Sequence, residues 1–227
     1  MEIDPGRIAL WGCSASGGYG LIVAARDRRI ACVVAQCASL DPGHDGWRAM
    51  TRDGFGGSLR RFVHAQRDKA RARFGLSPHR IPAVGRPGTS AALTAPGAYE
   101  GYTQLMSTSR SFRNTVCARM FLERPEEDLK AAVAQVSCPV LIIRGEKDEL
   151  VTADSQRRIE EALGDKLTIT TYPAGHFELY GEPHFEAAIA DTIAFLQATL
   201  FAGAQTPEYA PSEPETPHIA PPEPTAI

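Results

Sequence analysis

The sequence lacks the features that mark several large classes of protein. Its five cysteines show no C-x-x-C spacing, which argues against a zinc or disulfide framework and predicts buried thiols in a reducing cytoplasm. No early apolar run follows a basic start, so we expect neither a signal peptide nor a membrane span. The formal net charge is −3 and no basic stripe is present, so neither nucleic acid nor an anionic membrane is an expected partner. The cysteines are Cys13, Cys32, Cys37, Cys117 and Cys138.

The residues that are present suit one globular domain. With 227 residues, 43% of them hydrophobic, the chain can bury a sizeable core. Its apolar runs are short and nearly continuous, as in a parallel sheet that is covered on both faces. We expect strands over residues 8–11, 29–36, 139–144 and 166–172. Helices are expected over residues 18–25, 58–73, 99–106, 112–122, 126–136, 152–164 and 183–200.

Strands and helices alternate at the two ends of the domain but not in its middle. Residues 1–40 form a predicted βαβ unit, and residues 126–202 resume the alternation. Residues 41–125 are mostly helical and are predicted to form a lid over the site, or else a packed subdomain. Within them, residues 58–73 carry Leu59, Phe62, Val63 and Ala70 on one side and a run of arginines, interpreted as a solvated face, on the other. Residues 203–227 are rich in Pro and Glu without periodicity, so we expect disorder there.

Residues 7–18 have the layout of a nucleophile elbow, a strained strand-to-helix turn that exposes a serine hydroxyl. An apolar strand leads into Gly12-Cys13-Ser14-Ala15-Ser16. Small residues flank Ser14 at the required positions, although Ser16 stands where glycine is usual. Ser14 is therefore the predicted nucleophile and Ala15 N–H a predicted oxyanion donor. Ser16 is a rival nucleophile, and a simple connecting turn or a phosphate cradle is an alternative interpretation.

Two further strand ends carry candidate catalytic groups. Asp148 follows the strand over residues 139–144, and His176 follows the strand over residues 166–172. With Ser14 they give the order serine, acid, histidine, which is the order of α/β-hydrolases. Ser14 would attack, His176 would accept its proton, and Asp148 would hold the imidazole. Asp154 and Glu146 are alternative acids, and His184 is an alternative histidine.

On these residues the chain resembles the α/β-hydrolase superfamily over about residues 3 to 201. Residues 7–18, 139–148 and 173–180 carry the resemblance. The elbow, residues 81–88 and the Gly-His-Phe-Glu-Leu-Tyr stretch resemble the dienelactone-hydrolase-like and acyl-peptidase-like branch, which includes polyketide-associated hydrolases. The resemblance implies a three-layer αβα fold and a serine hydrolase for ester, thioester or related acyl bonds. It implies no metal and no cofactor.

The elbow strand of this superfamily lies in mid-sheet, whereas here it starts near residue 7. We therefore expect a C-terminal portion of the fold, with a parallel sheet of about four strands and an open apolar edge that favours a homodimer. The loop that supplies a second oxyanion donor would be missing, which predicts that this chain alone is weakly active or inactive. An acyltransferase with the same triad and a non-catalytic remnant are the alternative functions. A phosphate-binding module is disfavoured because no lysine follows the glycines.

Overall fold

The computed structural model describes residues 4–122, 129–151 and 153–201. Its centre is a sheet of four parallel strands in the order β1-β2-β5-β6. The strands are β1 (Ile8–Cys13), β2 (Ile30–Gln36), β5 (Val140–Gly145) and β6 (Leu167–Tyr172). The predicted α/β class and the four-stranded parallel sheet are confirmed.

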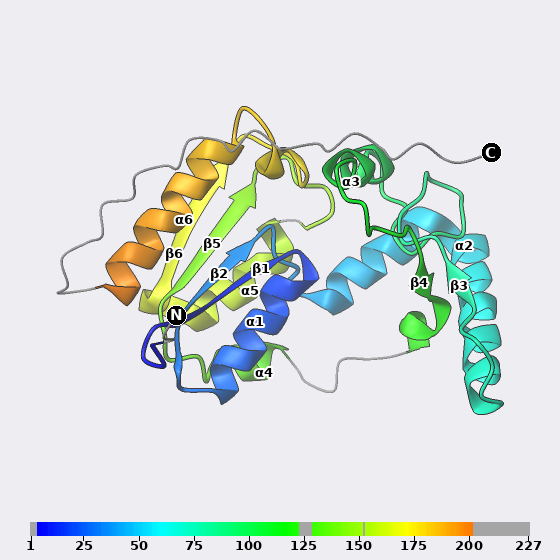
Figure 1. The fold of residues 1–227 in the computed structure, drawn as a ribbon, viewed down its shortest axis with the longest axis horizontal. Helices are drawn as coiled ribbons and strands as arrows, with labels where there is room; N and C mark the ends of the chain where they lie inside the picture. Colours follow the sequence, from blue (N-terminus) through cyan, green and yellow to red (C-terminus); the bar gives the residue numbers. More distant parts are fainter. Residues whose placement is uncertain (1–3, 123–128, 152, 202–227) are drawn as a thin grey trace, which may run out of the picture.

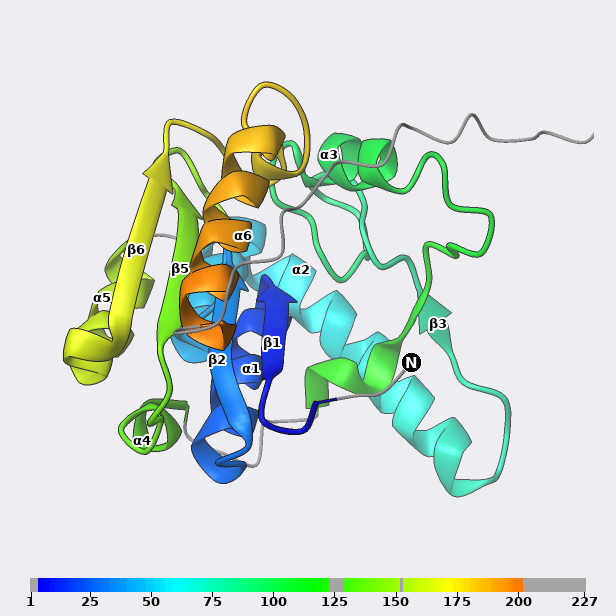
Figure 2. The same ribbon diagram turned by 60° about the vertical axis from the view of Figure 1, so that its left-hand side comes forward.

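Helices cover both faces of this sheet (Figures 1 and 2). On one face lie α1 (Ala15–Arg26), α4 (Leu129–Val133) and α5 (Ala153–Leu163). On the other lies α6 (Phe185–Leu200). Two short 3-10 helices, Gly164–Lys166 (η2) and Glu178–Tyr180 (η3), precede and follow β6.

The side chains of β2 and β5 divide between these two layers because successive residues of a strand point to opposite faces. Val33, Ala35, Val140 and Ile142 join the cluster that includes α1, α4 and α5. Val34, Leu141 and Ile143 join the cluster that includes α6. The central residues of both strands must therefore be apolar on both faces, and this explains the hydrophobic runs over residues 30–35 and 140–143.

The chain from α2 to η1, between β2 and α4, forms an insertion that lies to one side of the sheet (Figure 1). It contains α2 (Pro42–Arg73), β3 (Arg80–Ile81), α3 (Ala98–Leu105), β4 (Val116–Cys117) and η1 (Ala118–Leu122). The strands β3 and β4 pair in an antiparallel arrangement. The predicted helix over residues 112–122 is wrong, since a short strand and a 3-10 helix occupy its second half.

The interpretation of α2 also needs correction. Leu59, Phe62 and Val63 are about half exposed, at 48%, 50% and 57%. Arg61, in contrast, is buried, forms an ion pair with Asp53 and donates a hydrogen bond to the hydroxyl of Thr94 at 3.0 Å. The pattern of residues within this helix did not reveal which of its faces would be buried, because the burial of Arg61 depends on its contacts with Asp53 and Thr94.

A second buried carboxylate, that of Asp68, ties the insertion together. It accepts hydrogen bonds from the backbone N–H of His79 at 2.7 Å and of Arg119 at 2.9 Å. The guanidinium of Arg119 adds an ion pair at 2.8 Å. One side chain of α2 therefore fixes the start of β3 and η1 relative to the helix.

The first strand of the sheet has an open edge within the described residues. There β1 pairs with β2 alone, and the side chain of Trp11 is 53% exposed. In the part of the chain that is described, no helix combines the length and apolar character needed to cross a membrane. The predicted disordered tail, residues 203–227, lies outside the described residues, as does Thr152, the first residue of the helix expected over residues 152–164.

Candidate active site

The turn between β1 and α1 is strained at Ser14. Ser14 has φ 51° and ψ −126°, a backbone conformation that non-glycine residues rarely adopt. Its backbone is held on both sides: its N–H donates to Gln36 O and its carbonyl accepts from Ser39 N–H, both at 3.0 Å. A Cβ at Gly12 would lie 2.5 Å from Ser16 O, so only glycine fits there. Strain of this kind, held by surrounding contacts, is typical of a functional residue.

The side chain of Ser16 distinguishes it from Ser14. Its hydroxyl donates to Cys13 O at 2.7 Å and accepts from Cys13 N–H at 2.9 Å. Ser16 thus closes the turn with its own side chain, in place of the usual glycine. Because both interactions hold its hydroxyl on the backbone, the geometry favours Ser14 over Ser16 as the nucleophile.

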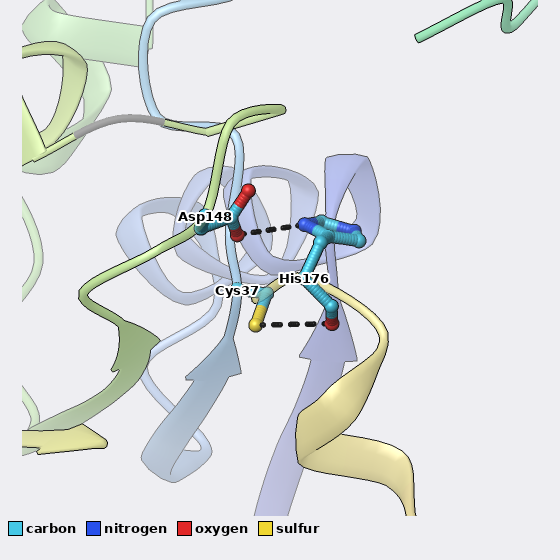
Figure 3. Close-up of side chains that lie close together, drawn as sticks. All are labelled: Cys37, Asp148 and His176. Carbon is cyan, nitrogen blue, oxygen red and sulfur yellow. Dashed lines mark hydrogen bonds and ion pairs between the residues drawn. The ribbon is translucent and has the colours of Figure 1, made fainter. Parts of the chain in front are cut away.

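Asp148 and His176 meet at the carboxyl ends of β5 and β6. The Nδ1 of His176 lies 2.7 Å from Oδ2 of Asp148, and both side chains are almost fully buried (Figure 3). The other carboxylate oxygen, Oδ1, accepts the backbone N–H groups of Leu150 at 2.8 Å and Val151 at 2.9 Å. These contacts fix the carboxylate, which in turn orients the imidazole.

The two loops that carry this pair depend on a glycine at the end of β5. A Cβ at Gly145 would overlap the carbonyl group of Ala174, so the absence of a side chain lets the loops approach. The backbone N–H of Lys147 then donates to Ala174 O at 3.0 Å. The glycine in Gly-Glu-Lys-Asp is therefore a packing requirement as well as a turn signal.

The alternative acid and histidine do not form such a pair. Glu146 is exposed, and the side chain of Asp154 lies outside the description. His184 lies beside Tyr172, with ring centroids 6.0 Å apart. Of the predicted site residues, the structure brings Asp148 and His176 together. Within the described residues no hydrogen bond links Ser14 to His176, although catalytic hydrogen bonds are often long in the absence of substrate.

A third side chain, Cys37, lies at the same point and was missed from the sequence. It directly follows β2, has φ 45° and is fully buried. Its Sγ lies 3.7 Å from His176 O (Figure 3). The position could have been noticed, because it too follows the carboxyl end of a parallel strand.

Cys37, Asp148 and His176 form the one group among the described residues whose ligand atoms are close enough to share a metal ion. Their existing contacts do not favour one. Burial raises the pKa of the Cys37 thiol, and the Asp148 charge raises it further, so the thiol stays protonated. The Asp148 carboxylate already accepts two backbone N–H groups and holds the imidazole.

A cavity of about 870 Å³ opens beside His176. Its walls come from residues 96–108 of the insertion, from the loop after β5 and from the loop that carries the histidine. They include Gly101, Gln104, Lys147, Leu150, Phe177 and Tyr180. None of the described aromatic side chains of the insertion lines it: Phe55 is 83% exposed, and Tyr102 packs on Phe112 with ring centroids 5.7 Å apart.

The insertion touches both loops of the Asp148–His176 pair. Leu150 and Phe177, which lie close to these two residues in sequence, pack in one apolar cluster with Val84, Ala95 and Ala98 of the insertion. The ring of Phe177 also lies edge-on to the imidazole of His176, with centroids 5.1 Å apart. The insertion is therefore part of the support of the site.

Three features together define a class of protein. They are a parallel sheet between helical layers, a buried carboxylate–imidazole pair beyond the carboxyl edge of that sheet, and a strained serine turn at the end of another of its strands. The family model described as alpha/beta hydrolase fold matches residues 2–183. The chain belongs to the alpha/beta hydrolase fold family.

Individual relatives agree with this assignment. Quorum-quenching protein AidA of Acinetobacter baumannii is 31% identical over 196 residues, which are 86% of this chain and 63% of that protein. The crystal structure of alpha/beta hydrolase GrgF from Penicillium sp. sh18 superposes with a TM-score of 0.65 at 21% identity, covering 87% of this chain and 65% of that one. DcsB, solved with its substrate analogue, gives 0.63 at 25% identity, covering 86% and 66%. The chain thus spans slightly less than two thirds of the length of each.

Proposed function

We propose that the chain is a serine hydrolase that cleaves an ester, thioester or related acyl bond. The observation that carries the proposal is the buried Asp148–His176 pair, whose Oδ2 and Nδ1 atoms lie 2.7 Å apart. The two residues follow β5 and β6 of the sheet whose strand β1 leads into the strained Ser14 turn. Membership of the alpha/beta hydrolase family supports it.

Each residue has a role that follows from its position. Ser14 Oγ attacks the acyl carbon, and His176 accepts its proton at Nε2, because Nδ1 faces Asp148. The Asp148 carboxylate stabilises the imidazolium that forms. The N–H of Ala15 is among the first of α1, which have no intrahelical acceptor, so it is available for the oxyanion. His176 then returns the proton to the leaving group, and water releases the acyl group.

In this proposal the insertion acts as a lid, because it forms one wall of the 870 Å³ cavity beside His176. The relative named for quorum quenching suggests where to look for a substrate. Signalling molecules with an ester, lactone or amide bond are the first compounds to test.

A fluorophosphonate probe tests the proposal without knowledge of the substrate. We expect covalent labelling of the wild-type chain at Ser14 by peptide mass analysis. Ser14→Ala and His176→Ala should abolish it, whereas Ser16→Ala should leave Ser14 as the labelled residue. Absence of labelling in a folded sample would favour a non-catalytic remnant.

Hydrolysis and acyl transfer differ in what attacks the acyl-enzyme. Turnover of a p-nitrophenyl ester in water, measured with and without an added alcohol or amine, separates them. An acyl product formed on the added nucleophile would point to the acyltransferase alternative. Turnover as fast as that of ordinary esterases would refute the expectation of weak activity.

A further inference from the structure

We infer that Cys37 is a positioning residue for His176: its thiol donates to the backbone carbonyl of the histidine and, as a weak donor beside the Asp148 carboxylate, competes little with the imidazole for that carboxylate. The inference rests on the proposed function, since it assigns a role within the same site. It is carried by the placement of three side chains from three different strands or strand ends (Figure 3).

Cys37 combines a strained backbone conformation with complete burial. Its φ of 45° places a non-glycine residue in the left-handed region, in a segment that is entirely buried. The backbone compensates for this strain, because Cys37 N–H donates to Ile143 O of β5 at 2.7 Å. The conformation directs the side chain toward the loop of His176 (Figure 3).

The thiol lies between the loops that carry Asp148 and His176. Sγ donates to His176 O at 3.7 Å, and it lies with the nearest Asp148 oxygen and His176 ring nitrogen in a group that spans no more than 4.8 Å. On the other side, Gln36, the residue before Cys37, accepts the N–H of Ser14 at 3.0 Å. The end of β2 therefore contacts the nucleophile turn and the histidine loop at consecutive residues.

The chemistry of sulfur explains why a cysteine suits this position. A thiol is a weak hydrogen-bond donor, whereas a hydroxyl is a strong one. A serine here could donate to the neighbouring Asp148 carboxylate and weaken the interaction with the imidazole. Because burial raises the pKa of the thiol, it remains an uncharged S–H that fills the space without adding a second anion.

The remaining ionisable groups around the histidine come from two loops. Ionisable side chains from the loop that carries Asp148 and from the loop that carries His176 line the cavity. The cavity residues of the insertion carry no ionisable side chain. Burial also raises the pKa of Tyr180, so its phenol stays neutral. The groups are Lys147, Glu149, Glu178, Tyr180 and Glu182 together with Asp148 itself. None of them changes in the experiment below.

The test compares Cys37→Ser with Cys32→Ser. Cys32 is equally buried and lies within β2, about 16 Å along the chain from Cys37, which follows that strand. Both substitutions bury a hydroxyl, so both should lower the melting temperature. Only Cys37→Ser should move the acidic limb of the rate–pH profile, by about 0.5–1 pH unit toward lower pH, because the carboxylate stabilises the imidazolium less. Equal profiles for the two variants would overturn the inference.

Cys37→Ala provides a second variant. It removes the donor to His176 O without adding a hydroxyl, so we expect about 10-fold slower probe labelling with the acidic limb unmoved. Labelling at the wild-type rate in Cys37→Ala would overturn the positioning role, even if Cys37→Ser failed to fold.

An NMR titration keeps this inference separate from the proposed function. The imidazole signals of His176 are followed against pH in Ser14→Ala, with and without Cys37→Ser. A shifted titration, together with no probe labelling of the wild-type chain, would uphold the role of Cys37 and reject the nucleophile. An unshifted titration, together with labelling of the wild-type chain at Ser14, would do the reverse.

Discussion

A methyl group added at Gly101 tests whether the insertion supports the catalytic histidine. A Cβ at this residue of α3 would lie 2.5 Å from Cγ, 2.6 Å from Cδ2 and 2.8 Å from Cβ of Phe177. Carbon atoms in contact prefer about 3.5–4.0 Å, so α3 or the Phe177 ring must move by about 1 Å. Since Phe177 directly follows His176 and packs against its ring, we expect the imidazole to move with it.

Two magnitudes follow from this displacement. Overpacking of this kind destabilises a fold by about 1–3 kcal/mol. A shift of about 1 Å at a catalytic group can lower the rate about 100-fold. Gly101→Ala should therefore reduce kcat/KM for a p-nitrophenyl ester about 10- to 100-fold, a larger effect than its loss of melting temperature alone would cause.

Two further variants isolate the cause. Phe177→Ala removes two of the three clashing atoms and leaves the Cβ contact at 2.8 Å, so adding Gly101→Ala to it should lower the rate less than Gly101→Ala does in the wild-type chain. Gly56→Ala is a matched control, because a Cβ at that glycine of α2 meets nothing within 4 Å. An unchanged rate in Gly101→Ala, or the same reduction in the Phe177→Ala background, would refute the reasoning.

Three further predictions concern the turn, the insertion and the sheet edge. Gly12→Ala should slow probe labelling at least 10-fold, because its Cβ would meet Ser16 O at 2.5 Å; wild-type labelling would contradict the elbow assignment. Burial alone raises the pKa of Asp68, but hydrogen bonds from Arg119 and His79 outweigh it and hold the pKa of the folded chain below 3.8. The stability that this carboxylate contributes is therefore present above pH 3.8 and is lost as the pH falls through the pKa of the folded chain. Acid unfolding followed by circular dichroism should show this loss in the wild-type chain but not in Asp68→Asn, which lacks the charge at every pH. If the open β1 edge mediates a dimer, Trp11→Lys should lower the mass measured by light scattering, and a wild-type chain that is monomeric throughout would exclude that dimer.

The sequence alone determined the sheet and the places where chemistry could occur. Runs such as residues 140–143 are apolar at every position, as is typical of a strand covered on both faces, so the layers followed from local composition. Parallel strands all end at one edge, so Ser14, Asp148 and His176 could be assigned to that edge from chain order. The glycines at positions 12 and 145 marked the turns because no other residue fits them.

Only the tertiary structure decided which groups meet. The pairing of Asp148 with His176, rather than Glu146 or His184, depends on the close approach of two loops through Gly145. The burial of Arg61 depends on Asp53 and Thr94, and the support of the histidine depends on Cys37, 139 residues away in sequence. Local periodicity records which residues share a face, but it cannot record what lies opposite that face, because the partner comes from a distant part of the chain.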